Sequence, residues 1–445
     1  MIGRSLGHIR RTASTLLRAG NVSTPVATRY SISARFRPYN GPFLSPAAPA
    51  RPSHLIQSLK FTTSSSSSDS SDDKDAPKED AKTHRAVGYW YLLSGALVFS
   101  IVVVGGVTRL TESGLSIVEW NLIKGMKPPT NPEEWAVEFE KYKQFPEFIK
   151  TNHKMDLEEF KFIFYMEWAH RMIGRFIGLA FILPATYFAA RGYMSKAIQK
   201  RSLIVATMIG CQGLLGWYMV KSGLDPSLLE DPNAVPRVNQ YWLAAHLGSA
   251  FLIYSLMFTT GFGILRANSS PKYLQQLKTV LANPALKPFK GSVHGLTGLV
   301  FLTALSGAFV AGLDAGLIYN EFPFMGDGII PGDMWAFTDR GDRSVSWWRN
   351  LLENPAAAQF DHRVLAMTTA SSVLALWIYS RRLVLPRTSR IAVNALLAVT
   401  VGQVSLGIAT LIYFVPVPVA AAHQAGSLTL LSVALWLMHS LRRVR

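Results

Sequence analysis

The longest uncharged stretch of the sequence runs from Ile391 to Leu441 and contains no Asp, Glu, Lys or Arg. About 20 apolar residues cross the hydrocarbon core of a bilayer, so this stretch is long enough to cross it twice. At its centre, Pro416-Val417-Pro418 would break a continuous helix and therefore marks a turn between two spans. Charged residues make up only 16% of the chain, whereas about 25% is usual in soluble proteins. A soluble globular domain is thereby excluded.

Other apolar windows, uncharged or with charges only in their opening turns, bring the expected number of membrane-spanning helices to eight. The first four are Ala86–Thr108, Tyr165–Ala190, Ser202–Val220 and Val238–Leu265. The second four are Gly291–Leu313, Ala358–Ser380, Ile391–Val415 and Pro418–Leu441. The expected fold class is therefore an all-α polytopic membrane protein.

The two groups of four spans resemble each other. A His-Arg pair occurs in span 2 (His170-Arg171) and again in span 6 (His362-Arg363), and Ala-Ala-His occurs in spans 4 and 8. Both halves begin on the same side of the membrane, so the repeat is parallel. We expect two four-helix bundles, each able to hold a cofactor among its facing helices. The expected boundaries are 86–266 for the N-terminal bundle, 267–290 for a linker and 291–445 for the C-terminal bundle.

The N-terminal segment has the composition of a mitochondrial presequence. Residues 1–60 carry eight Arg and one Lys, and no acidic residue precedes Asp69. An Arg-rich, Ser-rich segment of this kind is typical of import signals, with a disordered basic tail as the alternative. We expect a presequence over residues 1–62 and a polar linker over 63–85.

The loops predict the orientation of the spans. The connectors after spans 2, 4 and 6 and the C-terminus are basic and contain no acidic residue, whereas the opposite loops are mixed or acidic. By the positive-inside rule, both termini of a mitochondrial inner-membrane protein of this pattern lie in the matrix.

Four of the ten histidines lie inside spans at matched depth, two in each half: His170, His246, His362 and His423. An imidazole in hydrocarbon costs free energy unless it is paired, which makes each a functional candidate. Two imidazoles per bundle, without carboxylate or thiolate partners, suit the two axial positions of a haem. The single cysteine, Cys211, excludes zinc or iron–sulfur sites built on several thiolates.

The two halves differ three residues before the first histidine, where one has Glu167 and the other Gln359. A carboxylate there can position water, accept a proton or stabilise positive charge, so we predict that the N-terminal bundle is catalytic. The alternative is that Glu167 only pairs with Arg171 one turn later. Arg109, Arg171 and Arg363 are candidates to bind haem propionates, with snorkelling to the headgroups as their alternative.

These motifs resemble the haem A synthase family in its mitochondrial form, over roughly residue 86 to the C-terminus. The resemblance rests on four motifs within eight spans, namely residues 105–116 (GGVTRLTESGLS), residues 167–174 (EWAHRMIG), His362-Arg363 and His423-Gln424. It implies oxidation of the C8 methyl group of haem O, through hydroxylated intermediates, to the formyl group of haem A for cytochrome c oxidase. The cysteine pair of some bacterial members is absent, because residues 109–164 contain no cysteine.

The resemblance also implies site roles and partners. His170 and His246 would flank the substrate haem, His362 and His423 would ligate a haem b, and Glu167 matches the family's important acidic residue. Electrons would come from a ferredoxin and its reductase, and haem O from haem O synthase. Cytochrome c oxidase assembly factors and the lipid bilayer are further expected partners. No nucleic acid is expected, and self-association of the chain stays open.

Three other function classes compete with this interpretation. A di-haem b-type protein that oxidises quinol would use all four histidines but would not need the difference between Glu167 and Gln359. A transporter with histidine proton relays would place its sites nearer the midplane. An assembly scaffold without chemistry would not need paired imidazoles.

Overall fold

The computed structural model describes residues 83–230, 232, 234–336 and 346–443. The expected presequence, residues 1–62, and all but the last three residues of the expected linker lie outside these ranges. The described residues form helices and turns, and none of them forms a β-strand.

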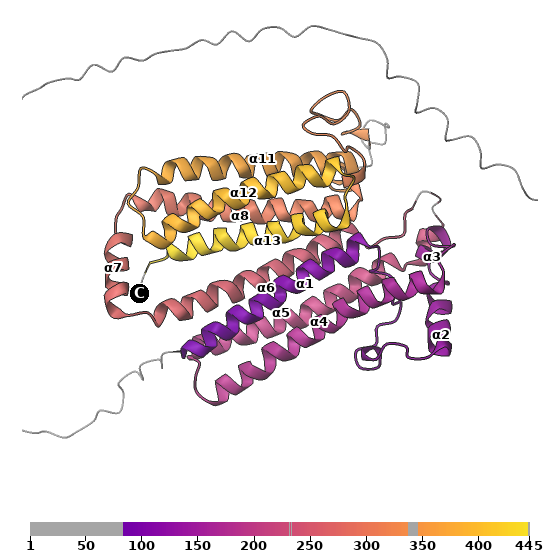
Figure 1. Ribbon diagram of the computed structural model, residues 1–445, viewed down its shortest axis with the longest axis horizontal. Helices are drawn as coiled ribbons and strands as arrows, with labels where there is room; N and C mark the ends of the chain where they lie inside the picture. Colours follow the sequence, from indigo (N-terminus) through magenta and orange to yellow (C-terminus); the bar gives the residue numbers. More distant parts are fainter. Residues whose placement is uncertain (1–82, 231, 233, 337–345, 444–445) are drawn as a thin grey trace, which may run out of the picture. The chain divides into compact units, whose positions relative to one another are not determined.

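The first group of long helices comprises α1 (Arg85–Leu110), α4 (Leu157–Ala190), α5 (Lys196–Gly223) and α6 (Gln240–Ala267). Helix α1 packs against α4 and α6, and α5 packs against the same two helices, so α4 and α6 face each other across a four-membered ring (Figure 1). A capping box starts α4, where the Asp156 side chain accepts a hydrogen bond from the Glu159 backbone N–H and the Glu159 side chain accepts one from the Asp156 backbone N–H.

The second group repeats this arrangement with α8 (Leu286–Gly312), α11 (Pro355–Ser380), α12 (Arg387–Ile412) and α13 (Val417–Ser440). Helices α11 and α13 occupy the facing positions in this ring. The expected break is confirmed: α12 ends at Ile412 and α13 begins after Pro416. Phe414 and Val415 in the turn have φ values of 60° and 55°, a left-handed backbone conformation that residues other than glycine rarely adopt.

Seven helices in the described part of the chain are long and apolar enough to cross a membrane: α1, α4, α5, α6, α8, α12 and α13. The remaining long helix, α11, has 26 residues, enough to span a bilayer. Its first turns contain the polar residues Gln359, Asp361, His362 and Arg363, and it is not one of the seven. The all-α membrane fold is confirmed, and the number of eight spans stays a prediction.

Several short elements connect the long helices. The larger ones are α2 (Pro132–Tyr142), α3 (Pro146–Lys150), α7 (Pro271–Leu281) and α10 (Trp347–Glu353). Single 3₁₀ turns are η1 (Lys124–Met126), η2 (Pro226–Leu229) and η3 (Ala315–Leu317). Helix α2 buries Trp135, Phe139 and Tyr142 against Phe160 of α4, so the loop after α1 has an aromatic core of its own. The predicted linker at 267–290 contains α7 and the first residues of α8.

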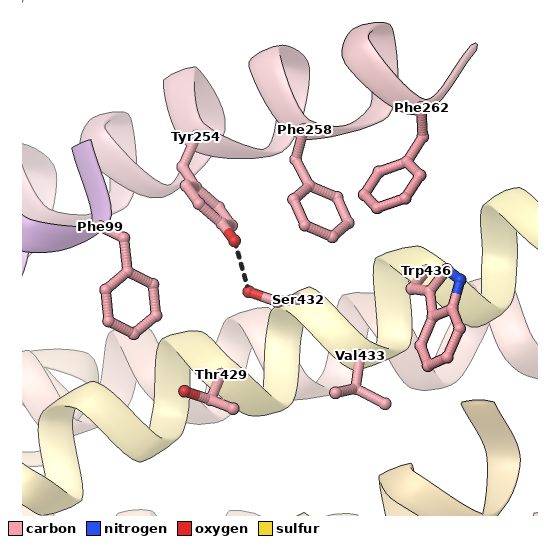
Figure 2. Close-up of a pocket in the computed structure, with 8 residues that line it drawn as sticks. All are labelled: Phe99, Tyr254, Phe258, Phe262, Thr429, Ser432, Val433 and Trp436. Carbon is pink, nitrogen blue, oxygen red and sulfur yellow. Dashed lines mark hydrogen bonds between the residues drawn. The ribbon is translucent and has the colours of Figure 1, made fainter. Parts of the chain in front are cut away.

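The two helix groups meet through three helix pairs. Two of them, α1 with α13 and α8 with α6, are related by the repeat, and α6 also packs against α13. An apolar groove of about 510 Å³ lies between α1, α6 and α13. Figure 2 shows that the Tyr254 hydroxyl reaches across this groove to Ser432, at 2.7 Å. At the end of α6, Arg266 donates to the carbonyl oxygens of His439, Arg442 and Arg443.

Candidate functional site

Each of the four predicted histidines packs against a glycine on the preceding long helix of its bundle. A Cβ atom added to that glycine would lie 2.9–3.1 Å from an imidazole atom, which is closer than ordinary packing. The glycine therefore gives the ring room at the centre of the bundle. The four pairs are Gly105 with His170, Gly216 with His246, Gly307 with His362, and Gly407 with His423.

In the C-terminal bundle, the rings of His362 and His423 face each other with their centroids 6.5 Å apart and their planes at 89°. A metal–imidazole bond is about 2 Å long. Adding the distance of about 1 Å from nitrogen to ring centre, two imidazoles on opposite sides of one iron have centroids about 6 Å apart. The pair therefore has the spacing that bis-histidine haem ligation requires. His170 and His246 occupy the corresponding facing helices, α4 and α6, of the N-terminal bundle.

The donor set also fits haem better than a bare metal ion. No group of three or more His, Cys, Asp or Glu residues within the described ranges is arranged to hold a metal. A porphyrin supplies four of the six ligands to iron, so the protein needs to supply only two. Each bundle has two imidazoles that can do so.

The second histidine of each half is held by a glutamine one helix away. In the N-terminal bundle, Gln212 donates to the His246 carbonyl oxygen at 2.8 Å and its amide nitrogen lies 3.2 Å from Nδ1 of the ring. The Ser249 hydroxyl donates to the other end of this amide, Gln212 Oε1. This chain of hydrogen bonds fixes the orientation of the His246 ring.

The C-terminal copy of this arrangement is incomplete. Gln403 donates to the His423 carbonyl oxygen at 2.9 Å, but Gly426 stands at the position of Ser249. Gln403 Oε1 and His423 Nδ1 are buried, and neither has a hydrogen-bond partner among the described residues. The two bundles therefore support equivalent histidines differently.

The first histidine of each half shows the opposite asymmetry. The Ser306 hydroxyl lies 2.7 Å from Nδ1 of His362. In the N-terminal bundle, Val104 stands at the corresponding position before Gly105, so the same helix offers His170 no hydroxyl group. The Ser306 hydroxyl donates to the Thr303 carbonyl oxygen, so its oxygen is free to accept from Nδ1–H of His362. A hydrogen bond donated by Nδ1–H makes an imidazole a stronger electron donor to a metal, so this contact distinguishes the two sites electronically.

Glu167 is buried, with 3% of its surface exposed, and its carboxylate accepts four hydrogen bonds. Oε2 accepts from the Ser116 hydroxyl at 2.8 Å and from the Ile117 backbone at 2.7 Å. Oε1 accepts from Arg171 Nε at 3.0 Å and Nη2 at 2.6 Å. The ion pair with Arg171, one of the two interpretations of Glu167, is therefore present. Through its bonds from Ser116 and Ile117, Glu167 also ties the loop after α1 to α4, the helix that carries His170.

Gln359 builds the same connection in the C-terminal bundle without a negative charge. Its amide donates to the carbonyl oxygens of Ala315 and Tyr319 at 2.8 and 3.2 Å, and its Oε1 accepts from Arg363 at 3.1 Å. Arg363 also donates to the carbonyl oxygens of Tyr319 and Phe324. The predicted difference between the halves is therefore a charge difference within one shared geometry.

Two of the arginines considered for propionate binding, Arg171 and Arg363, donate hydrogen bonds to carbonyl oxygens of the loops after α1 and α8. Arg171 donates to the carbonyl oxygens of Ile117 and Glu119 and lies 5.1 Å from the ring of Trp120. Arg363 does the same for the loop after α8, as described above. Arg175, which the sequence did not single out, continues the series by donating to the carbonyl oxygens of residues 121 and 122.

Arg109 lies at the end of α1 and pairs with Asp314 at 2.6 Å, while Arg237 pairs with the other oxygen of Asp314 at 2.7 Å. This ion-pair cluster joins the two bundles. The Nε atoms of Arg109 and Arg363 are buried without a hydrogen-bond partner in the described structure. Both guanidinium groups therefore keep one donor for a further acceptor.

Glu147 is a buried acid that the sequence did not indicate. It lies in α3, outside the spans, and is 6% exposed. Burial raises its pKa to about 8, although the hydrogen bond from Tyr142 and the charge of Arg109 oppose the shift, and the carboxylates of Glu167 and Glu112 add to it. The Tyr142 hydroxyl donates to Glu147 at 2.9 Å and accepts from Asn152 at 2.8 Å.

Fold and site together define a polytopic α-helical membrane protein with two groups of four long helices, each carrying a pair of half-buried imidazoles suited to haem. The chain belongs to the cytochrome oxidase assembly protein family (COX15-CtaA), which matches residues 88–435.

Its relatives include haem A synthases of animals and fungi. The chain is 53% identical over 360 residues to "Heme A synthase COX15" of Bos taurus, covering 81% of this chain and 83% of the relative. The corresponding protein of Saccharomyces cerevisiae is 46% identical over 373 residues, or 82% of this chain and 77% of the relative. A "Heme A synthase-mitochondrial ferredoxin fusion protein" of Schizosaccharomyces pombe is 46% identical over 370 residues, covering 80% of this chain and 60% of the relative. These names do not support the quinol-oxidising alternative.

Proposed function

We propose that this chain is a haem A synthase of the mitochondrial inner membrane. It oxidises the C8 methyl group of haem O to the formyl group of haem A, through hydroxylated intermediates, for cytochrome c oxidase biogenesis. One observation carries the proposal: the two bundles place their imidazoles on equivalent helices, but three residues before the first histidine the N-terminal bundle has a buried carboxylate, Glu167, where the C-terminal bundle has the uncharged Gln359. An electron-transfer protein would need no such difference.

The two bundles have different roles in this proposal. His170 and His246 hold the substrate haem O in the N-terminal bundle, residues 86–266. His362 and His423 hold a resident haem b in the C-terminal bundle, residues 291–445, and their 6.5 Å centroid distance supports this assignment. When bound, haem b supplies one-electron redox chemistry.

Glu167 is the catalytic residue in this proposal. Its carboxylate lies on the same helix as His170, one turn away, which is near the edge of a porphyrin ligated by that histidine. Donors already occupy both oxygens, which favours a role in holding charge and in orienting water or substrate over a role as a free base.

The three arginines are assigned to the haem propionates on the basis of charge and depth. Arg109 and Arg363 each keep a buried Nε donor, and Arg171 lies beside the predicted substrate site. Because propionates are anionic and face the aqueous edge, a guanidinium group there would form charge-assisted hydrogen bonds with them.

The proposed partners follow from the chemistry. A relative that is named as a fusion with mitochondrial ferredoxin supports ferredoxin, with its reductase, as the electron source. Haem O synthase would supply the substrate, and assembly factors of cytochrome c oxidase would receive the product. The basic loops after α4, α6 and α11 support an orientation with both termini in the matrix.

Pigment analysis of the purified full-length protein tests the proposal. We expect haem b together with haem O, hydroxylated haem O or haem A, identified by mass. His362→Ala should lose haem b, whereas His170→Ala should keep haem b and lose the farnesylated haems. A wild-type protein that carries only haem b, even when cells also make haem O, would contradict the proposal and favour the di-haem electron-transfer class.

A further inference from the structure

Gln424 directly follows the C-terminal histidine His423 on α13 and reaches into the other bundle. Its amide nitrogen donates to the carbonyl oxygen of Val102 on α1 at 2.9 Å. Its Oε1 lies against Gly106, so close that a Cβ atom on this glycine would overlap it. The contact thus requires both the amide of Gln424 and the missing side chain of Gly106.

Gly105 and Gly106 divide two tasks between them. A Cβ atom on Gly105 would lie 3.1 Å from Nε2 of His170, in the N-terminal bundle, whereas Gly106 receives Gln424 from the C-terminal bundle. Two adjacent glycines of α1 are therefore in contact with His170 on one side and with the neighbour of His423 on the other. The two glycines belong to the motif at residues 105–116 and Gln424 to the motif His423-Gln424. The proposed function gives none of these three residues a role.

The repeat supplies an internal comparison. The residue that follows His246 is Leu247, and the interface between α6 and α8 around it is apolar, with Phe301 and Leu305 packed beside it. The side chain of Leu305 also lies 3.2 Å from the Cβ position of Gly248. Among the described residues, the polar connection next to a site histidine therefore exists at the interface of α1 and α13 and not at that of α6 and α8, so packing of the bundles does not by itself require it.

Other polar contacts between the bundles lie at other levels of the helices. Arg109, four residues after Gly105, pairs with Asp314, and Tyr241, five residues before His246, donates to Glu353. Tyr254 and Ser432, which are joined in Figure 2, follow His246 and His423 by eight and nine residues. This separation is about 12–14 Å along the helices. Of these contacts, the one made by Gln424 lies at the level of the imidazoles.

We propose that Gln424 is a positioning residue that fixes the two histidine pairs relative to each other and lies on the route by which electrons pass between the two haem sites. This inference rests on the proposed function. The route runs along the peptide from His423 to Gln424, through its hydrogen bond to Val102, and along one turn of α1 to Gly105, which touches His170. A haem held by His362 and His423 would supply one electron along this route, and a haem held by His170 and His246 would accept it. The ferredoxin then restores the donor.

The experiment uses purified full-length protein that contains haem b and the product haem A. The formyl group shifts the absorption of haem A, so the two haems can be followed separately after rapid reduction by a photoreductant. Gln424→Leu keeps the side-chain size and removes the hydrogen bond, and Gly106→Ala displaces the amide. We expect both variants to keep both haems with unchanged spectra and to slow the electron transfer from haem b to haem A on the order of tenfold.

Ser432→Ala is the matched control, because it also removes one hydrogen bond between the bundles but lies away from the histidines. It should leave the rate unchanged. Gln424→Leu protein that holds both haems and transfers electrons at the wild-type rate would overturn the proposal, as would an equal loss of rate in Ser432→Ala. If the wild type contains no haem A or haem O, the proposed function fails, and this inference fails with it.

Discussion

Replacing Glu167 by glutamine separates the catalytic role of this residue from its structural role. The variant loses the negative charge but keeps an oxygen that can accept from Arg171. Gln359 makes the matching contact in the other bundle, where it accepts from Arg363 at 3.1 Å. Removing one partner of a buried ion pair typically costs about 3–5 kcal/mol. The contact with Arg171 can survive in the variant, but the new amide nitrogen would face the Ser116 hydroxyl and the Ile117 N–H, which now donate to Glu167. We therefore expect a loss of about 1–3 kcal/mol of unfolding free energy.

The expected loss of activity is much larger than this loss of stability. Groups that act directly on a reacting centre contribute about 10²–10⁴-fold to the rate, so the ratio of haem A to haem b should fall by about that factor while haem b stays bound. The assay is chromatographic analysis of extracted haems. Glu119→Gln is the control, because Glu119 lies in the same loop and pairs with Lys141 on the surface. An unchanged haem A ratio in Glu167→Gln would show that Glu167 only anchors the loop.

Three further predictions concern residues around the site. Glu147→Gln should raise the melting temperature at pH 8 but not at pH 4, because a folded-state pKa of about 8 against an ordinary 4.5 costs the wild type about 1.4 kcal/mol per pH unit between these values. A gain of the same size at both pH values would refute this cause. Ser306→Ala should raise the midpoint potential of haem b by about 20–60 mV, because His362 loses a hydrogen bond worth about 0.5–1.5 kcal/mol; redox titration measures it, and an unchanged potential would contradict the assigned contact. Gly216→Ala should lower the occupancy of the N-terminal haem, because the added methyl group presses on the imidazole. Gly210→Ala on the same helix meets open space and should not, and equal haem contents in the two variants would refute the role of the glycine.

The sequence was sufficient for features that depend on local composition. Hydropathy located the long helices, and the double proline located the turn before α13, because each property belongs to a single segment. The sequence did not reveal α2 and α3. Their stability comes from aromatic packing against α4, with Tyr142 and Phe160 buried together, and such packing between segments leaves no clear periodic signal in a short stretch.

For the candidate site, the sequence determined which imidazoles lie inside the long helices at matched depth, and that one half carries Glu167 where the other carries Gln359. Depth can be counted along a helix, because each residue adds a fixed rise. Only the tertiary structure decided which side chains these residues meet. Gln212, Ser306 and Gln424 reach their partners through the rotation and packing of neighbouring helices. Those relations are set when the whole set of helices packs together, and no single helix encodes them.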